Sequence, residues 1–230
     1  MARIETVLLD AGGVLLDLDY AFLKRLLEAR RIATSVEALS ESESRARTTI
    51  ERRVREGGRT GEAWRDYFRV LLTRVGTPPD WTDEIIETLW EAHHRVGLWT
   101  VAIDGAVEAV RAVRAAGYRV GVVSNAEGRV ERDLANAGYA GMFEAVVDSH
   151  LVGVEKPDPA IFRIALERMN AAPETTVFVG DVPSVDVAGA RAAGLRAILL
   201  DRHGLYEDSD APRLSSMAAL PPWLAGELSQ

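Results

Sequence analysis

The second half of the chain alternates short apolar runs with helical patterns, and this alternation restricts the fold more than any other sequence feature. The apolar runs are "RVGVV", "EAVVDS", "TTVFVGD" and "RAILL", and helical patterns cover residues 104–116, 129–137, 156–169 and 184–193. Three of these patterns end alike, at Gly117, Gly138 and Gly194, as glycine-closed helices do. Parallel strands need crossover connections of this kind. The sequence therefore predicts an α/β fold with a Rossmann-like, mostly parallel sheet and helices on both faces.

A long helical insertion interrupts this pattern near the N-terminus. An apolar, β-rich run over Ile4–Leu9 predicts the first strand, and no further strand pattern follows before Asp104. Apolar residues recur at helical spacing in four segments instead, which are Asp19–Arg31, Ser35–Glu56, Thr60–Val75 and Thr82–Arg95. We therefore expect a core domain of residues 1–16 and 99–230 and a four-helix cap domain of residues 17–98.

Two smaller features complete the expected architecture. Four tryptophans, at positions 64, 81, 90 and 99, lie in the insertion and its return link, and we expect them to pack mainly in the core of the cap. The C-terminal segment "SSMAALPPWLAGELSQ" is expected to dock loosely or fray.

Composition excludes several classes of protein. The 230 residues include no cysteine, so disulfides, thiolate nucleophiles and Cys-ligated zinc are absent. A net charge of -8 argues against partners such as nucleic acid or an anionic membrane. Neither a leader-like N-terminus nor an apolar run long enough for a membrane span is present, so we expect a cytoplasmic protein. We also expect either a monomer or a homodimer.

Polar residues follow the predicted strands, where open α/β sheets bind their ligands. Asp10 follows the first strand, Ser124 and Asn125 follow "RVGVV", and Lys156 lies in the loop after "EAVVDS". Two further acids, Asp181 and Asp186, follow "TTVFVG". Clustered carboxylates favour a divalent cation, and Mg²⁺ prefers oxygen ligands. The Ser124 hydroxyl and the Lys156 ammonium suit phosphate oxygens. Together with Asn125, which follows Ser124, they are candidate substrate-binding residues.

The chain resembles the haloacid dehalogenase superfamily in four segments: "VLLDAGGVLLD", "VVSNA", "EKPDPAIF" and "VFVGDVPSVDVAGARAAG". The resemblance implies that Asp10 is a nucleophile that forms an aspartyl-phosphate. It also implies that Asp10, the backbone carbonyl of Gly12 and Asp181 hold Mg²⁺, with Asp186 supporting the metal or its waters. Ser124 and Lys156 would bind the transferring phosphoryl group.

One position departs from the pattern of the family's phosphatases. These usually carry a second aspartate two residues after the nucleophile, where this chain has Gly12. A positioned acid typically contributes ~10² to 10⁴-fold to the rate, so its loss weakens catalysis without abolishing it. Replacements open to the chain are Asp17, Asp19, Asp66 and His93, or a substrate whose leaving group needs little protonation.

Because position 12 is a glycine, functions other than that of a phosphatase stay open. Phosphonate-cleaving members of the family use a cap lysine as a Schiff base, and Lys24 is the only lysine in the predicted cap. Dehalogenase members also lack the second acid, and a binding or regulatory protein is a further alternative. The pattern of acids favours a Mg²⁺-dependent hydrolase acting on a small phosphorylated metabolite.

Overall fold

The chain forms two compact units. The computed structural model describes residues 2–58 and 60–227. Met1–Asp17 and Trp99–Gln230 make up one unit, called the core unit below, and Leu18–Leu98 make up the other, called the insertion unit. The boundary differs by one residue from the predicted one, since Asp17 groups with the core unit.

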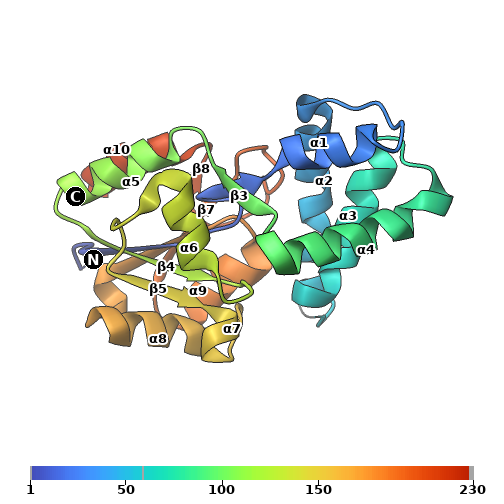
Figure 1. The fold of residues 1–230 in the computed structure, drawn as a ribbon. Helices are drawn as coiled ribbons and strands as arrows, with labels where there is room; N and C mark the ends of the chain where they lie inside the picture. The colour runs from blue at the N-terminus through green and yellow to red at the C-terminus, as the bar shows by residue number, and fades with distance from the viewer. Residues whose placement is uncertain (1, 59, 228–230) are drawn as a thin grey trace. The chain divides into compact units, whose positions relative to one another are not determined.

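A six-stranded parallel sheet forms the centre of the core unit (Figure 1). Its spatial order is β5-β4-β1-β6-β7-β8, and every pairing is parallel. The strands are β1 (Thr6–Leu9), β4 (Arg119–Ser124), β5 (Ala145–Asp148), β6 (Thr176–Gly180), β7 (Arg196–Leu200) and β8 (Arg213–Leu214). The predicted parallel α/β fold is confirmed, although β1 begins two residues later than expected.

Helices cover both faces of this sheet because successive strand residues point to opposite sides. Val7 and Leu9 pack in one apolar cluster with α5 (Ala106–Ala115), α6 (Val130–Leu134) and α10 (Leu220–Glu227). Leu8 packs in the other, with α8 (Pro159–Met169) and α9 (Ala188–Ala192). Figure 1 shows α5 and α10 on one side of the sheet and α8 on the other.

Glycine closes three of the core helices, as predicted. Gly117, Gly138 and Gly194 have φ of 92°, 98° and 85°, which is the left-handed region that favours glycine. Helix α8 begins at Pro159, three residues after the start of its helical pattern, because the Asp158 side chain caps it by accepting a hydrogen bond from the Ala160 N–H and proline fits the first turn.

A second, two-stranded sheet corrects the prediction that no strand lies between the first strand and Asp104. It pairs β2 (Leu16–Leu18) with β3 (Trp99–Ala102). Strands of three and four residues are too short to leave a recognisable alternation in sequence. The pairing also corrects the expectation for Trp99, which packs partly buried against the apolar cluster of the core unit.

The insertion unit contains the four expected helices: α1 (Tyr20–Glu28), α2 (Val36–Arg55), α3 (Thr60–Arg74) and α4 (Pro79–Val96). Asp19 and Ser35 cap the first two by accepting hydrogen bonds from the N–H groups of Phe22 and Ala38. Helix α4 begins three residues earlier than predicted, because proline fits the first turn of a helix. None of the helices in the described residues is long and apolar enough to cross a membrane.

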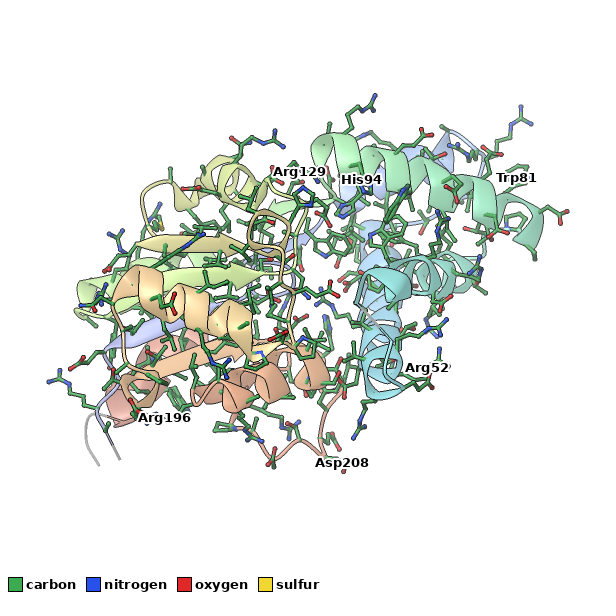
Figure 2. All side chains as sticks on the ribbon, turned by 90° about the horizontal axis from the view of Figure 1, so that it is seen from below. Arg52, Trp81, His94, Arg129, Arg196 and Asp208 are labelled. Atoms are coloured by element: carbon green, nitrogen blue, oxygen red, sulfur yellow. The ribbon has the colours of Figure 1, made fainter. Side chains whose placement is uncertain are left out.

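The tryptophans of the insertion unit differ in burial. Trp64 is buried and packs on Phe68 and Trp90, with ring centroids 4.4 and 5.0 Å apart. Trp81 lies near the start of α4 and is 41% exposed, so the prediction of a packed core position was wrong there (Figure 2).

A buried carboxylate joins α2 to α3. Glu43 accepts hydrogen bonds from Arg47, one turn later on α2, and from the hydroxyl of Tyr67 on α3. Burial and the nearby Glu43 charge raise the pKa of Tyr67 well above its ordinary value. This ion pair cannot be recognised from the sequence, because Glu43 is one of several charged residues on an amphipathic helix.

The C-terminal segment forms helix α10 and packs in the core unit at Leu220 and Leu224, so the prediction of loose docking was wrong there. Leu220 and Leu224 of α10 are fully buried, and the Tyr118 hydroxyl donates a hydrogen bond to the Leu224 carbonyl. Residues 228–230 lie outside the described residues.

We predict that Leu224→Ala lowers the free energy of unfolding by about 2 to 5 kcal/mol, since it leaves a cavity in the core unit. Chemical denaturation measures this loss. The same substitution at Leu151, which is 71% exposed, is the control and is expected to change stability by less than about 0.5 kcal/mol. Equal effects at the two positions would contradict the packing of α10.

Candidate active site

The chain order of the strands reverses at β1, which lies between β4 and β6. Asp10 directly follows β1, Ser124 is the last residue of β4, and Asp181 directly follows β6. The parallel register aligns Leu9 of β1 with Val122 and Val179 on the neighbouring strands. The three polar side chains therefore start from adjacent strand ends, where open α/β sheets bind ligands.

Lys156 lies at the centre of the cluster. Its Nζ is 2.7 Å from Oδ1 of Asp10 and 2.8 Å from Oδ1 of Asp186, and only 1% of the residue is exposed. The ammonium also lies 5.3 Å from the centroid of the Phe178 ring. A buried ammonium of this kind needs charged partners, and here two carboxylates supply them.

Asp186 uses both carboxylate oxygens inside the protein. It lies in a single π-helical turn, Pro183–Val187, that follows β6. Oδ1 accepts from Lys156, and Oδ2 accepts from the N–H groups of Asp181 and Val182 at 3.0 and 2.9 Å. Asp186 therefore fixes both the ammonium and the backbone that carries Asp181.

The approach of Asp186 requires the glycine at the end of β6. A Cβ at Gly180 would lie 2.3 Å from Cβ and Cγ of Asp186, which is closer than such atoms can approach. The close contact explains why a residue with no side chain is needed at this position.

Asn125 and Ser124 contribute in different ways. The Asn125 amide donates to the carbonyl of Lys156 at 2.9 Å and accepts from the Lys156 N–H at 2.7 Å. Asn125 thus holds the loop that carries Lys156, a contact that its position in the sequence does not reveal. Ser124 is buried and pairs in register with Asp148 of β5.

Asp148 is a buried polar residue that the sequence analysis missed. Its carboxylate accepts hydrogen bonds from the N–H groups of Gly128, Val130 and His150. It therefore organises the loop after β4. An aspartate directly before the short helix α7 (Ser149–Val152) is a capping signal that could have identified it.

Three carboxylates group closely enough to hold one metal ion. Oxygens of Asp10, Asp181 and Asp186 all lie within 4.8 Å of one another. The cluster combines three acids with the one ammonium of Lys156, so a divalent cation would balance the remaining negative charge. Oxygen donors of this type suit a hard cation such as Mg²⁺.

Burial sets the electrostatics of the nucleophile candidate. Burial raises the pKa of Asp10 to about 6, Lys156 acts to lower it, and Asp186 acts to raise it. Burial also disfavours the charged form of Lys156, but Asp10 and Asp186 outweigh this effect and raise the pKa of the ammonium. Lys156 therefore remains a cation within the cluster.

Two of the acids that could replace the general acid missing at position 12 form hydrogen bonds elsewhere in the protein. Asp17 accepts hydrogen bonds from both terminal nitrogens of Arg202, at 2.7 and 3.0 Å. Asp19 caps α1. Each carboxylate thus has a structural task within its own unit.

The remaining candidates lie in the insertion unit. Asp66 pairs with Arg53 and Arg69, and His93 is buried with its ring 5.7 Å from that of Trp64. Lys24 forms a surface ion pair with Glu28, one turn later on α1.

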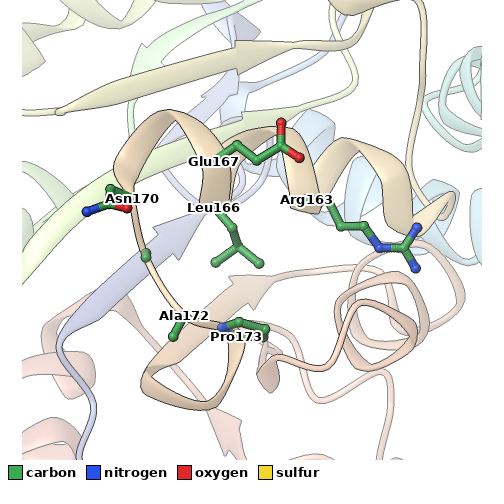
Figure 3. A pocket seen from close by; sticks show the side chains of 7 residues that line it. Arg163, Leu166, Glu167, Asn170, Ala172 and Pro173 are labelled. Atoms are coloured by element: carbon green, nitrogen blue, oxygen red, sulfur yellow. The ribbon is translucent and has the colours of Figure 1, made fainter.

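A separate surface cavity of about 630 Å³ lies at the C-terminal end of α8 (Figure 3). Arg163, Leu166, Glu167 and residues 170–173 line it. None of the candidate site residues is among them, so this hollow is distinct from the carboxylate cluster.

Comparison with known proteins agrees with the geometry. The family model described as haloacid dehalogenase-like hydrolase matches residues 4–194. A phosphoserine phosphatase of Thermus thermophilus is 37% identical over 145 residues, which cover 63% of this chain but only 57% of that protein. A glyceraldehyde 3-phosphate phosphatase of Methanopyrus kandleri is 30% identical over 90% of this chain and 88% of its own.

The fold also matches solved structures. A crystal structure of a dehalogenase superposes with a TM-score of 0.68 at 22% identity, covering 98% of this chain and 99% of the other. At this identity the match supports the fold and not the reaction.

We predict that Gly180→Ala lowers the free energy of unfolding by about 1 to 3 kcal/mol, because the added methyl group displaces Asp186. Thermal or chemical unfolding measures the change. Gly226→Ala on α10 is the matched control, since a Cβ there meets no atom within 4 Å. A Gly180→Ala protein as stable as the control would refute the close approach.

Asn125→Ala is expected to cost about 1 to 3 kcal/mol, because it removes two hydrogen bonds to the backbone of Lys156. Unfolding in denaturant gives the loss. The exposed Asn136→Ala is the control and should be nearly neutral. If both substitutions are neutral, Asn125 does not support the Lys156 loop.

Proposed function

Because this chain belongs to the haloacid dehalogenase-like hydrolases, we propose that it is a Mg²⁺-dependent phosphatase that cleaves phosphate monoesters of a small metabolite. The observation that carries the proposal is the position of Lys156 between Asp10 and Asp186, with Asp181 in the same group. A nucleophilic carboxylate, a buried cation and further acids are the parts that phosphoryl transfer requires.

Asp10 is the nucleophile in this proposal. Its N–H donates to the Val179 carbonyl, and its Oδ1 accepts from the Ala11 N–H at 2.7 Å, so backbone contacts orient the side chain. One oxygen attacks phosphorus while the phosphorus–oxygen ester bond breaks, so an aspartyl-phosphate forms and the alcohol leaves with the electron pair of that bond and a proton from solvent. Water then attacks phosphorus, and the bond to Asp10 breaks to release phosphate.

The other residues bind and orient the phosphoryl group. Lys156 offers a cation to its oxygens and holds Asp10 in position, and Ser124 offers a hydroxyl from the end of β4. Asn125 acts indirectly, through the backbone of Lys156. Sequence reasoning assigned it to the substrate, and its contacts favour a positioning role.

Asp10, Asp181 and the Gly12 carbonyl are the groups that would hold Mg²⁺. Asp186 is less suited to bind Mg²⁺ directly, because both of its carboxylate oxygens already accept hydrogen bonds. The parallel bridge between Gly12 and Leu16 uses the Ala11 carbonyl and the Gly13 N–H, so it does not engage the Gly12 carbonyl. When bound, the cation offsets negative charge on the phosphoryl oxygens.

Two other reactions receive less support. A Schiff base on Lys24 would require an amine that is free to react, whereas Lys24 pairs with Glu28 on the surface of α1. Carbon–halogen cleavage needs no divalent cation, so it gives no reason to gather Asp181 and Asp186 beside Asp10.

Asp10→Asn is expected to reduce Mg²⁺-dependent hydrolysis of phosphate monoesters by at least about 10³-fold, since it removes the nucleophile. The measurement is phosphate release from a broad panel of monoesters, with and without Mg²⁺. Asp208→Asn in an exposed loop is the matched control and should retain activity. Equal rates in the native and Asp10→Asn proteins, including equal inactivity, would refute the proposal.

A further inference from the structure

An aromatic ring occupies the space beside Gly12. A Cβ at position 12 would lie 3.7 Å from Cδ1 and 3.9 Å from Cγ of Trp99. Gly12 bridges Leu16 at the start of β2, and β2 pairs with β3, which carries Trp99. The fold thus places carbon atoms of an indole, and not a polar group, next to the residue two positions after the nucleophile.

The polar groups around Asp10 are engaged with one another. The acids that group with Asp10 within 4.8 Å are Asp181 and Asp186, and both oxygens of Asp186 accept hydrogen bonds. The Lys156 ammonium is shared between Asp10 and Asp186. Asp17, another candidate replacement for the missing acid, forms an ion pair with Arg202 through two hydrogen bonds. Asp17 and Asp186 thus have partners within the core unit, and the residue two positions after Asp10 is a glycine, which carries no acid.

This arrangement matters because leaving groups differ in their need for a proton. An alkoxide is a strong base, and its departure depends on a general acid. A carboxylate or a nitrophenolate is a weak base and leaves as a stable anion. A site without a positioned acid therefore discriminates between these two classes of phosphoryl compound.

We propose that the site is selective for activated phosphoryl compounds, namely acyl phosphates and phosphate esters with weakly basic leaving groups, and that Trp99 contacts the leaving group. This inference rests on the proposed function. An Asp10 oxygen bonds to phosphorus while the bond to the leaving oxygen breaks, and the electron pair stays on that oxygen as an unprotonated anion. Water then displaces Asp10 from phosphorus, and its proton passes to the released phosphate or to solvent.

A leaving-group series tests the proposal. The rate of leaving-group release is measured with Mg²⁺ under single-turnover conditions, for acetyl phosphate, aryl phosphates from nitrophenols to phenol, and glycerol phosphate. The native rate is expected to fall steeply as the leaving group becomes more basic, with glycerol phosphate the slowest. A native enzyme that cleaves glycerol phosphate as fast as nitrophenyl phosphate would overturn the inference and leave the phosphatase function standing.

Two substitutions at position 12 form a matched pair. Gly12→Asp adds an acid and is expected to accelerate cleavage of glycerol phosphate relative to that of acetyl phosphate by about tenfold or more. Gly12→Asn has nearly the same shape without the acid, and should give no acceleration. Equal acceleration by both variants, or none by a folded Gly12→Asp, would contradict the proposal.

The same measurements distinguish failure of this inference from failure of the proposed phosphatase function. Nitrophenolate release that disappears in Asp10→Asn supports the phosphatase function whatever the leaving-group dependence. If no compound is cleaved by the native protein, both the function and the inference are wrong. If Gly12→Asp fails to fold, the native series alone decides, and Gly226→Asp shows whether the substitution itself is tolerated at an open position.

Discussion

The buried ammonium of Lys156 is the constraint on which the rest of the site depends. Removing an ammonium from water is costly, and attraction to nearby carboxylates offsets this cost only when geometry is good and the remaining polar atoms are satisfied. Here Asp10 and Asp186 lie within hydrogen-bond distance of Nζ, the N–H groups of residues 181 and 182 complete the contacts of Asp186, and Asn125 fixes the backbone of Lys156 itself. Each of these residues thus stabilises the next, and they act as one polar network.

Sheet topology delivers the members of this network to one place. Asp10 follows the central strand, Asp181 and Asp186 follow its neighbour β6, and Lys156 comes from the segment after β5 on the other side. Because the strands are parallel, all three segments begin at the carboxyl ends of the strands, on the same side of the sheet. Residues separated by up to 176 positions in the sequence therefore meet at one place.

The features that could be predicted from the sequence are those that depend on hydrophobic periodicity and on the residues at strand ends. The parallel sheet, the glycine-closed helices and the gathering of Asp10, Lys156, Asp181 and Asp186 follow from short-range patterns that tertiary structure reinforces. The pairing of β2 with β3 could not be predicted, because strands this short exist through their partner and not through propensity. The packing of α10 was missed for a related reason, since the burial of Leu220 and Leu224 depends on a surface formed by α5 and the sheet. The different roles of Asn125 and Asp186 depend on the atoms that each side chain contacts. The residue type alone does not identify those atoms.

The contact between Gly180 and Asp186 has a consequence for how relatives of this chain diverge. A methyl group at position 180 and a carboxylate held at position 186 exclude each other, so neither position is free to vary alone while the turn keeps its shape. A lineage that replaces the aspartate with a smaller residue gains freedom at the glycine, and one that keeps the aspartate inherits the glycine with it. The two positions should therefore be gained and lost together, which makes the pair a more selective marker of this arrangement than either residue by itself.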